Sequence, residues 1–487
     1  YIKATKMDEE DSINNVRKKR AASLSLDNVE TRKAPLPFKH REIEAAPSAT
    51  MLPEVKVPRE RSALYKELKK GQQKAFDAIE ECATDRSPWG PKEFLLTGGA
   101  GTGKTFLQEA ILKDIPVSWC LSATTNKAAK VIQRKIGDLV PCRTIYSVLG
   151  MRMSPNEDML ELKKPTRPMD IGKYDIIAVD EASMANKMLT EYLRTQARYQ
   201  GVKILWIADD AQLNPVGEDE SPVFEVKHRA RLTKVLRHDN QILTFAQHVR
   251  KQVFACPNDS IRIRSDNDGD QGVWKLKTNT WMGQVEAAAD GGLFSEVDNT
   301  KVIAWRNNTV NLMNRMIRRR IFGSESAKQM WLPGDRISIR SPVIDRESDQ
   351  VVAHIDDEAT ISSVVDCRHS RYDMIRTHRI VIQIDNGPSL TIDVVSDRSE
   401  TTLLDELNRL AREAKNDHRK WKAFWDMRNA FCNIGHSYAQ TGHRAQGSTY
   451  KNVFLDASEI LANPNREEAL RGFYVGCTRP STRLLIT

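Results

Sequence analysis

Short apolar runs alternate with stretches of helical spacing from residue 63 onward. The apolar runs lie at 94–97, 119–123, 175–179 and 203–208, and they return at 302–305, 453–456 and 484–487. Among the first of these runs, residues 104–113 and 126–136 carry apolar side chains at helical intervals. A strand, a helix and another strand at this spacing predict a parallel sheet with helices on both faces. We therefore predict an α/β fold.

A different pattern fills residues 331–430. Short β-branched runs at 359–365, 380–384 and 389–395 are separated by turn residues such as Asn386-Gly387. Runs of this length with turns between them predict a small all-β insertion that resembles a barrel.

A helix is predicted just before the insertion, at residues 307–321. Its apolar positions would face the core: Val310, Met313, Ile317 and Ile321. Its basic positions would face outward: Arg315, Arg318 and Arg319. An outward basic face either follows the phosphates of a nucleic acid or is only solvated, and the pattern leaves both open.

Residues 1–62 differ from the rest of the chain. They are rich in charged residues, Ala, Ser and Pro and show no sustained period, which predicts a disordered tail or tether. The basic run at 17–20 fits a solvated cluster better than a nucleic-acid arm or a localisation signal. Because the chain opens with Tyr1 rather than Met, we expect a fragment, a processed product or an incomplete gene prediction.

Composition narrows the classes of function. The chain shows no secretory leader and no run of the ~18 apolar residues that a membrane span needs. Seven cysteines without a CxxC pair favour a reducing compartment, so we expect a cytoplasmic protein, in the host cytoplasm if the source is viral. Lys and Arg total 74 against 65 for Asp and Glu, and this net charge of +9 only weakly indicates a polyanionic partner.

A glycine-rich loop follows the first apolar run. Gly98 to Thr105 read GGAGTGKT, which fits GxxxxGK[ST] between a predicted strand and a predicted helix. Such a loop wraps a polyphosphate with its N–H groups, Lys104 would reach the β- and γ-phosphates, and the Thr105 hydroxyl would hold Mg²⁺. We expect the ATP phosphates to bind these residues: Gly98, Gly101, Thr102, Gly103, Lys104 and Thr105.

Two acids end the apolar run at 175–179. Asp180 suits the Mg²⁺ shell, and Glu181 would polarise the water that attacks the γ-phosphate. Many kinases and small GTPases lack the second acid, so its presence favours hydrolysis that drives motion. The next run ends at 208 and leads to Gln212, whose amide could sense the γ-phosphate.

These residues and several further segments, taken in order, resemble superfamily 1B helicases of the RecD and Pif1 type, and within them the Dda-type DNA helicases of phages. The resemblance covers about residues 63–487. The further segments are Gly71–Phe76, Ala123–Ala129, Thr144–Ser147, Asp209–Gly217, Leu232–Arg237, Thr441–Thr449 and Tyr474–Arg479. Tyr146 stands where the family usually has histidine, and residues 150–166 lack the aromatic tip of the family's strand-separating pin.

The resemblance implies a role for residues in most of these segments. Gln72 would contact the adenine, Arg237 and Arg479 would reach the γ-phosphate from the second motor domain, and Gly447 would lie at the nucleotide. The implied strand contacts are Thr124, Asn126, Thr144, Tyr146, Thr441, His443 and Gln446. Leu160 or Leu162 would act as the apolar wedge of the pin.

The resemblance also implies the architecture. The fold class would be α/β, with two tandem RecA-like parallel-sheet motor domains, a small β-hairpin insertion in the first and an SH3-like all-β insertion in the second. The expected ranges are a tail at 1–62, a first motor domain at 63–232 with its pin at about 150–166, a second motor domain at 233–330 and 431–487, and the insertion at 331–430.

The implied function is an ATP-dependent DNA helicase with ATP and Mg²⁺ as cofactors, moving 5′ to 3′ on single-stranded DNA. Its partners would be single-stranded and forked DNA, with single-strand-binding or other replication proteins as further candidates, and we expect a monomeric motor away from membranes. An RNA helicase or a translocase that strips proteins without unwinding remains an alternative, as does a binding protein that has lost turnover.

Overall fold

The structure is a computed structural model that describes residues 61–137, 139–156, 159–165, 167–235, 241–255, 261, 263–345 and 351–487. The predicted tail, apart from its last two residues, and Arg237 lie outside these residues. Residues 60–487 form one compact unit.

The first sheet has six parallel strands in the order β3-β2-β6-β7-β1-β8. These strands are β1 (Glu93–Gly98), β2 (Trp119–Ala123), β3 (Cys142–Thr144), β6 (Ile176–Asp180), β7 (Lys203–Ala208) and β8 (Arg229–Leu232). The accompanying helices are α2 (Ala63–Glu67), α3 (Lys70–Thr84), α4 (Lys104–Asp114), α5 (Asn126–Ile136), α6 (Ile145–Val148) and α7 (Lys187–Gln200). The predicted parallel sheet is confirmed.

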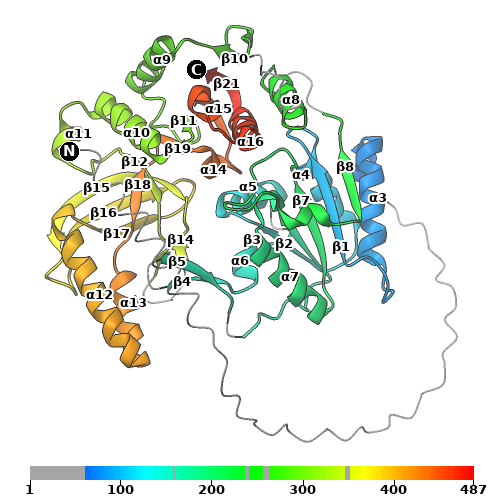
Figure 1. The fold of residues 1–487 in the computed structure, drawn as a ribbon, viewed down its shortest axis with the longest axis horizontal. Coiled ribbons are helices and arrows are strands. Elements are labelled where there is room, and N and C mark those ends of the chain that lie inside the picture. Colours follow the sequence, from blue (N-terminus) through cyan, green and yellow to red (C-terminus); the bar gives the residue numbers. More distant parts are fainter. Residues whose placement is uncertain are drawn as a thin grey trace, which may run out of the picture. The chain divides into compact units, whose positions relative to one another are not determined.

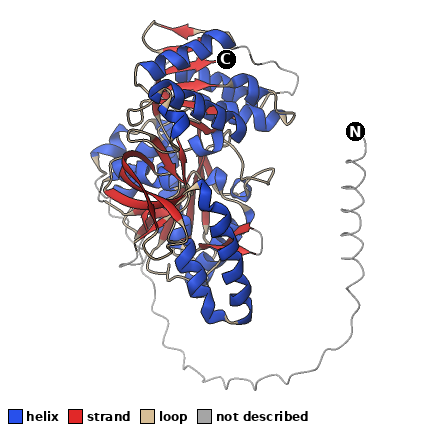
Figure 2. Cartoon of the chain, turned by 90° about the vertical axis from the view of Figure 1, so that its left-hand side faces the viewer, coloured by secondary structure: helices blue, strands red, loops and turns tan. Residues whose placement is uncertain are grey.

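Successive strand residues bury their side chains on opposite faces of this sheet, as the pleat of a strand requires. Leu96 and Ile176 belong to one apolar cluster, whereas their neighbours Leu95 and Ile177 belong to another. Because both faces are covered, the strands read as continuous apolar runs rather than as alternating ones. Figure 2 shows the strands in red with helices in blue packed around them.

The second sheet has the order β19-β11-β20-β21-β10-β9, and its strands are parallel except for the β9–β10 pair. Its strands are β9 (Asp266–Asn267), β10 (Gly272–Lys275), β11 (Thr300–Ala304), β19 (Ala439–Thr441), β20 (Tyr450–Leu455) and β21 (Pro480–Ile486). Its helices are α8 (Gln241–Val253), α9 (Thr278–Asp290), α10 (Asn307–Phe322), α11 (Glu325–Lys328), α14 (Gly442–Ala445), α15 (Ala457–Leu461) and α16 (Arg466–Cys477). The two sheets confirm the expected pair of RecA-like domains (Figure 1).

A five-stranded antiparallel sheet interrupts the second domain, in the order β17-β16-β15-β12-β18. Its strands are β12 (Arg336–Ile339), β15 (Glu358–Arg368), β16 (Arg376–Ile384), β17 (Ser389–Val395) and β18 (Ile434–His436). A two-stranded ribbon of β13 (Val343–Ile344) and β14 (Val351–Ala353) lies between β12 and β15 in sequence. A second two-stranded ribbon, β4 (Arg152–Asn156) with β5 (Met159–Lys163), interrupts the first domain.

The prediction that the insertion is all β is wrong. Residues 400–428 form two helices, α12 (Glu400–Asn416) and α13 (Trp421–Arg428), which Figure 1 shows beside the antiparallel sheet. Leu403, Leu407 and Leu410 recur at helical spacing and pack on the cluster around Met427. This spacing was visible in the sequence and predicts a helix.

Helix α10 also corrects one prediction. Val310, Met313 and Ile317 are buried as expected, and Arg315 and Arg319 are exposed. Arg318, however, is buried with 6% of its surface exposed, and its Nε lies 2.9 Å from Oδ1 of the fully buried Asp335. Arg318 also donates to the carbonyl oxygens of Ser326 and Gln329. It is therefore a structural residue, because a buried carboxylate requires a partner charge.

Candidate functional site

The glycine-rich loop connects β1 to α4 at the carboxyl edge of the first sheet. Gly101 and Gly103 have φ values of 77° and 80°, a left-handed conformation that a side chain would strain. The Thr102 hydroxyl donates to the Gly99 carbonyl oxygen at 2.8 Å. The Lys104 ammonium donates to the carbonyl oxygens of Gly98 and Gly99. The loop thus brings a cation and the first turn of an 11-residue helix to one place, as a polyphosphate site requires.

Gln72 lies directly beneath this loop and is 3% exposed. Its Nε2 donates to the carbonyl oxygens of Thr102 and Gly103 at 3.4 and 3.3 Å, and its Oε1 accepts from the Lys69 N–H. In this structure the predicted adenine contact is therefore engaged with the loop itself.

The two acids lie at the end of β6, two strands away from the strand that precedes the loop: Asp180 is the last residue of β6, and Glu181 follows it. The Glu181 N–H donates to Asp180 Oδ1 at 2.7 Å, and Glu181 has a left-handed φ of 51°. Burial, and next the Asp180 charge, raises the pKa of Glu181 to about 7. Burial raises the pKa of Asp180 too, although Lys104 opposes the rise. Strained backbone and carboxyl groups with raised pKa values are typical of catalytic sites.

Side chains of the second domain contact this edge through Tyr474 on α16. The Tyr474 hydroxyl donates to Asp209 Oδ2 at 2.8 Å and accepts from the Ala100 N–H at 3.0 Å. Tyr474 is fully buried, and burial followed by the Asp209 charge raises its pKa well above the ordinary value. It therefore stays neutral and links the phosphate loop to the segment after β7.

Arg479 approaches the same site from the end of α16. Its guanidinium donates to the carbonyl oxygens of Val475 and Ser448 at 3.0 and 3.1 Å and to the Thr478 hydroxyl at 2.7 Å. Burial lowers the pKa of Arg479, and the Glu181 charge acts in the opposite direction. The charge of Glu181 in the first domain thus affects the pKa of Arg479 in the second, and the charge of Arg479 affects that of Glu181.

Gln212 of the first domain contacts Gln446 of the second. Its Oε1 accepts from Gln446 Nε2 at 3.3 Å, and both side chains are buried. Arg471 donates to the main-chain oxygens of Asp210 and Gln212 at 2.7 and 2.9 Å. Gly447, with φ 73°, lies so close to α5 that an added Cβ would be 3.2 Å from the Cβ of Ala128.

Sequence reasoning missed the contribution of helix α8. Gln247 Nε2 donates to the Ala100 carbonyl oxygen at 2.9 Å, and Arg250 pairs with Asp209 at 3.5 Å and also with Asp210. Leu243 packs against Gly101. Helix α8 carries only an ordinary amphipathic pattern, so no sequence signal indicated these contacts. Tyr474 lay within a quoted segment but had no predicted role.

The predicted strand contacts of the first domain lie at the ends of β2 and β3. Thr124 is buried, and its hydroxyl donates to the Glu181 carbonyl oxygen at 3.1 Å. Asn126 is the first residue of α5, and Thr144 caps α6 by accepting from the Ser147 N–H. Tyr146 is half-buried, and burial raises its pKa. The side chains of Leu160 and Leu162 lie outside the described part of the chain.

Of the predicted strand contacts of the second domain, Thr441 lines a small polar cavity of about 170 Å³. Thr441 lines it together with Asn307, Asn311, Gln440, Arg340 and Arg444. Burial, and next the Arg444 charge, lowers the pKa of Arg340, whose buried Nε has no hydrogen-bond partner among the described residues. Nearby, the His443 ring lies 5.4 Å from that of Trp305, and burial lowers its pKa.

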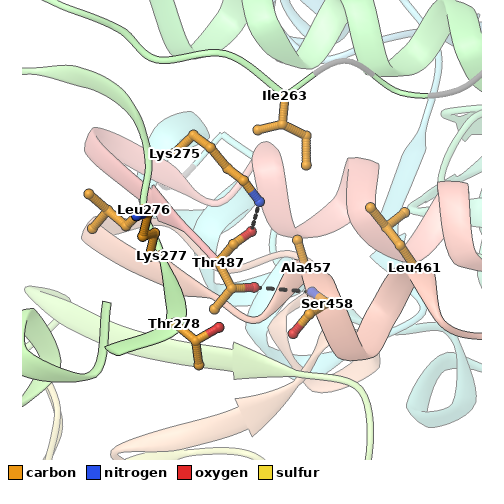
Figure 3. Close-up of a pocket in the computed structure, with 9 residues that line it drawn as sticks. All are labelled: Ile263, Lys275, Leu276, Lys277, Thr278, Ala457, Ser458, Leu461 and Thr487. Carbon is orange, nitrogen blue, oxygen red and sulfur yellow. Dashed lines mark hydrogen bonds between the residues drawn. The ribbon is translucent and has the colours of Figure 1, made fainter. Parts of the chain in front are cut away.

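The larger cavity, of about 490 Å³, lies elsewhere in the second domain (Figure 3). Its lining residues are Ile263, Lys275, Leu276, Lys277, Thr278, Ala457, Ser458, Leu461 and Thr487. None of the predicted site residues is among them. Lys275 donates to the Thr487 carbonyl oxygen at its rim.

The donor set beside the loop fits Mg²⁺. The Thr105 hydroxyl and the Asp180 carboxylate are hard oxygen ligands, and Mg²⁺ commonly takes only one or two protein ligands beside phosphate oxygens. Within the described ranges, no cluster of three or more His, Cys, Asp or Glu residues offers a separate metal site. Likewise, none of the described helices is long and apolar enough to cross a membrane.

Two family models and several known proteins match the chain. Residues 67–258 match the AAA domain, and residues 436–487 match the UvrD-like helicase C-terminal domain. The ATP-dependent DNA helicase dda of Enterobacteria phage T4 is 26% identical over 451 residues, covering 85% of this chain and 98% of the phage protein. An uncharacterized protein of Acanthamoeba polyphaga mimivirus is 22% identical over 485 residues, covering 81% of this chain and 94% of its own length.

A solved structure adds agreement on the fold. One chain in a structure of two coordinating Pif1 helicases at forked double-stranded DNA matches with a TM-score of 0.50 and 14% identity, covering 86% of this chain and 92% of that one. The fold, the family models and the phage relative together confirm the resemblance that the motifs predicted: the chain is similar to superfamily 1B helicases of the Pif1 and Dda type.

Proposed function

We propose that the chain is an ATP-dependent DNA helicase that moves 5′ to 3′ along single-stranded DNA and opens duplexes in replication, recombination or repair. The observation that carries the proposal is the composite site in which Tyr474 of the second domain bonds to the glycine-rich loop and to Asp209 of the first. A site completed by two domains makes nucleotide turnover depend on their relative position.

Hydrolysis would use the residues gathered at the first sheet. Lys104 would bind the β- and γ-phosphates, and Glu181 would accept the proton of the attacking water. Mg²⁺ held by Thr105 and Asp180 would neutralise phosphate charge. Arg479, and Arg237 by resemblance, would stabilise the charge that develops on the γ-phosphate, because a guanidinium stays ionised and matches phosphate oxygens.

Coupling to the strand would run through Gln212 and Gln446. Their hydrogen bond joins the segment after β7 to the Thr441–Thr449 segment, and Gly447 packs on α5. If the Gln212 amide shifts on loss of the γ-phosphate, it would therefore move Gln446 and the segment where the strand is expected to bind.

Strand phosphates would bind at helix starts and at the small polar cavity. At the start of α10, beside that cavity, the Glu459 carboxylate already accepts from the Trp305 and Arg306 N–H groups and from the Thr309 hydroxyl. Arg340 and Arg444 add two positive charges there. These two guanidinium groups, rather than the start of the helix, support a backbone phosphate at Thr441.

We expect the antiparallel β4–β5 ribbon to act as the pin. If it separates strands, replacing Leu160 and Leu162 by Gly should weaken unwinding and spare translocation along single strands. Streptavidin displacement from a strand end measures translocation independently of unwinding. Equal loss of both activities would contradict a pin.

The test of the proposal is ATP hydrolysis stimulated by single-stranded DNA, compared with RNA of the same length. We expect DNA to stimulate turnover more strongly than RNA does. Greater stimulation by RNA would favour an RNA helicase, and a lack of turnover with either strand would contradict a motor. A monomeric state, contacts with replication proteins and a cytoplasmic location are further predictions.

A further inference from the structure

Three consecutive acids in the insertion contact basic residues of both motor domains. Asp356, Asp357 and Glu358 form a turn between β14 and the start of β15, and we refer to them as the acidic turn. The turn is held on β12, where the Asp356 N–H donates to the Ile339 carbonyl oxygen and the Ile339 N–H donates to that of Asp357, both at 2.9 Å. Asp356 has a left-handed φ of 67°, which costs energy in a residue with a side chain.

Two of the acids reach the first motor domain at a single helix. Asp357 Oδ1 lies 2.6 Å from Lys130 Nζ, and Glu358 Oε1 lies 3.0 Å from Lys127 Nζ. Both lysines are on α5, directly after Thr124–Asn126, where we expect the strand to be held. The Lys127 pair is nearly buried, whereas the Lys130 side chain is 43% exposed.

The same turn also reaches the second motor domain. Glu358 Oε2 lies 2.8 Å from Lys301 Nζ on β11, and the Tyr450 hydroxyl donates to Glu358 Oε1 at 3.4 Å. Asp356 Oδ1 lies 2.8 Å from the Arg444 guanidinium on α14, within the Thr441–Thr449 segment. One turn thus touches the strand-contacting segments of both domains.

The charges at Glu358 are matched closely enough to keep it ionised. Burial would raise the pKa of this carboxyl group, but Lys127, Lys301 and Arg336 together hold the pKa well below its usual range. Arg336 is in turn paired with Asp385. Removing one partner of such a buried set leaves an uncompensated charge, so the contact between α5 and the insertion has a strongly preferred geometry.

We propose that the acidic turn is a positioning element that couples ATP turnover to strand movement, by holding α5 of the first motor domain in register with α14 and β11 of the second through the Lys127–Glu358 and Lys130–Asp357 pairs. The inference rests on the proposed motor function. The pairs cross the boundary between the motor domains, so any change in the distance between these domains must stretch or break them. Loss of the pairs would leave the ATP site intact but allow hydrolysis without a full step of the strand grip.

Lys130 and Asp357 offer the cleaner test, because their pair is partly exposed and neither is predicted to bind ATP. Lys130→Gln removes one charge, and Asp357→Asn removes the other while keeping an oxygen that can accept from the His354 N–H at 2.9 Å. Lys328→Gln is the matched control, since Lys328 forms an exposed ion pair of 2.6 Å with Glu325 on α11.

The measurements are ATP turnover with saturating single-stranded DNA and the number of base pairs opened per ATP hydrolysed. We expect Lys130→Gln and Asp357→Asn each to lower the base pairs opened per ATP about two- to fivefold, the range set by one partly exposed ion pair. Maximal turnover should stay near that of the unaltered protein and of Lys328→Gln. The double variant should be no worse than either single variant, because both remove the same contact.

Base pairs per ATP unchanged in both single variants, or losses that simply add in the double variant, would overturn the proposal. If Asp357→Asn does not fold, the exposed Lys130→Gln alone decides the outcome. Failure of the proposed function looks different, because the unaltered protein would then show no strand-stimulated turnover, and this would overturn the coupling role with it.

Discussion

The two motor domains share a strand order but differ in what their loops carry. In the first sheet the order is β3-β2-β6-β7-β1, and in the second the corresponding strands run β19-β11-β20-β21-β10. The strand that carries the phosphate loop, β1, therefore has β10 as its counterpart. Five residues, Gly99–Gly103, join β1 to α4, whereas only Leu276 and Lys277 join β10 to α9.

The short connection changes the chemistry available at that edge. At the first sheet, the glycine-rich loop accepts hydrogen bonds from the Lys104 ammonium. At the second sheet, Lys275, Lys277 and Thr278 line the cavity of about 490 Å³ (Figure 3). The second domain contributes instead through Tyr474 on α16, which bonds to the glycine-rich loop of the first, and we expect Arg479, which follows that helix, to act at the same site. The same strand order therefore carries different side chains in the two domains, because the connections between the strands differ.

The largest effect is expected at the two corresponding loops. Lys104→Ala removes the cation of the phosphate site and should lower ATP turnover at least about 10²- to 10³-fold, the loss typical of a charge-stabilising donor. Single-strand binding should persist, since it uses other surfaces. The exposed Lys277→Ala, at the counterpart position, should leave turnover within about twofold, as for a surface change away from the site. Steady-state phosphate release measures ATP turnover in both variants. A loss of turnover in Lys277→Ala as large as that in Lys104→Ala would contradict the proposed difference between the two loops.

A similarly large effect on ATP turnover is expected from replacing Arg479 in the second domain. Arg479→Ala should lower turnover about 10³-fold, the lower end for an arginine that stabilises phosphoryl transfer. ATP binding, followed by fluorescence of a labelled analogue, should weaken far less. Arg483→Ala on β21, also in the second domain but exposed, serves as the control. Normal turnover in Arg479→Ala would mean that the second domain does not complete the site.

The next effect concerns stability rather than turnover. Arg318→Ala leaves Asp335 buried without its main partner charge, so the free energy of unfolding should fall by about 3–5 kcal/mol. Arg319→Ala, one residue along α10 but exposed, should change it by less than about 0.5 kcal/mol. Urea denaturation of the two variants measures the difference. Equally small decreases in the free energy of unfolding of both variants would mean that Arg318 faces outward, as the sequence predicted.

The smallest effect concerns pH. If Glu181 is the general base, it acts only when ionised, and its pKa is raised to about 7. Below this pH the carboxyl group is protonated, so turnover should rise about tenfold per pH unit on the acid side and level off above about pH 7. A profile of kcat/KM against pH between 5 and 9 measures the limb. A limb that lies near pH 4, as for an unperturbed glutamate, would contradict the raised pKa.

Periodicity predicted regular elements well and isolated contacts poorly. Strand β7 at Lys203–Ala208 and helix α5 at Asn126–Ile136 were predicted to the residue, because their apolar spacing is continuous. Helices α12 and α13 were missed although Leu403, Leu407 and Leu410 have helical spacing, since the β-branched runs before them dominated the interpretation. The phosphate loop and its acids were found because their chemistry demands particular residues at fixed spacing.

The sequence did not predict contacts between segments that lie far apart along the chain. Helical spacing places Arg318 nearer the apolar face of α10 than Arg315 or Arg319, but its ion pair depends on Asp335, 17 residues away. The acidic turn likewise reads as a solvated run until Lys127 and Lys130, more than 220 residues earlier, are placed against it. Such pairings are set by tertiary packing, which a single sequence does not encode as a local pattern.

The most direct test of the central claim is ATP-driven separation of duplex DNA that carries a single-stranded tail at one end only, either 5′ or 3′. Lys104→Ala protein serves as the control for motor-independent melting. We predict unwinding of the 5′-tailed duplex and none of the 3′-tailed duplex. ATP consumption without separation of either duplex would contradict a helicase, and unwinding from the 3′ tail alone would contradict the proposed direction.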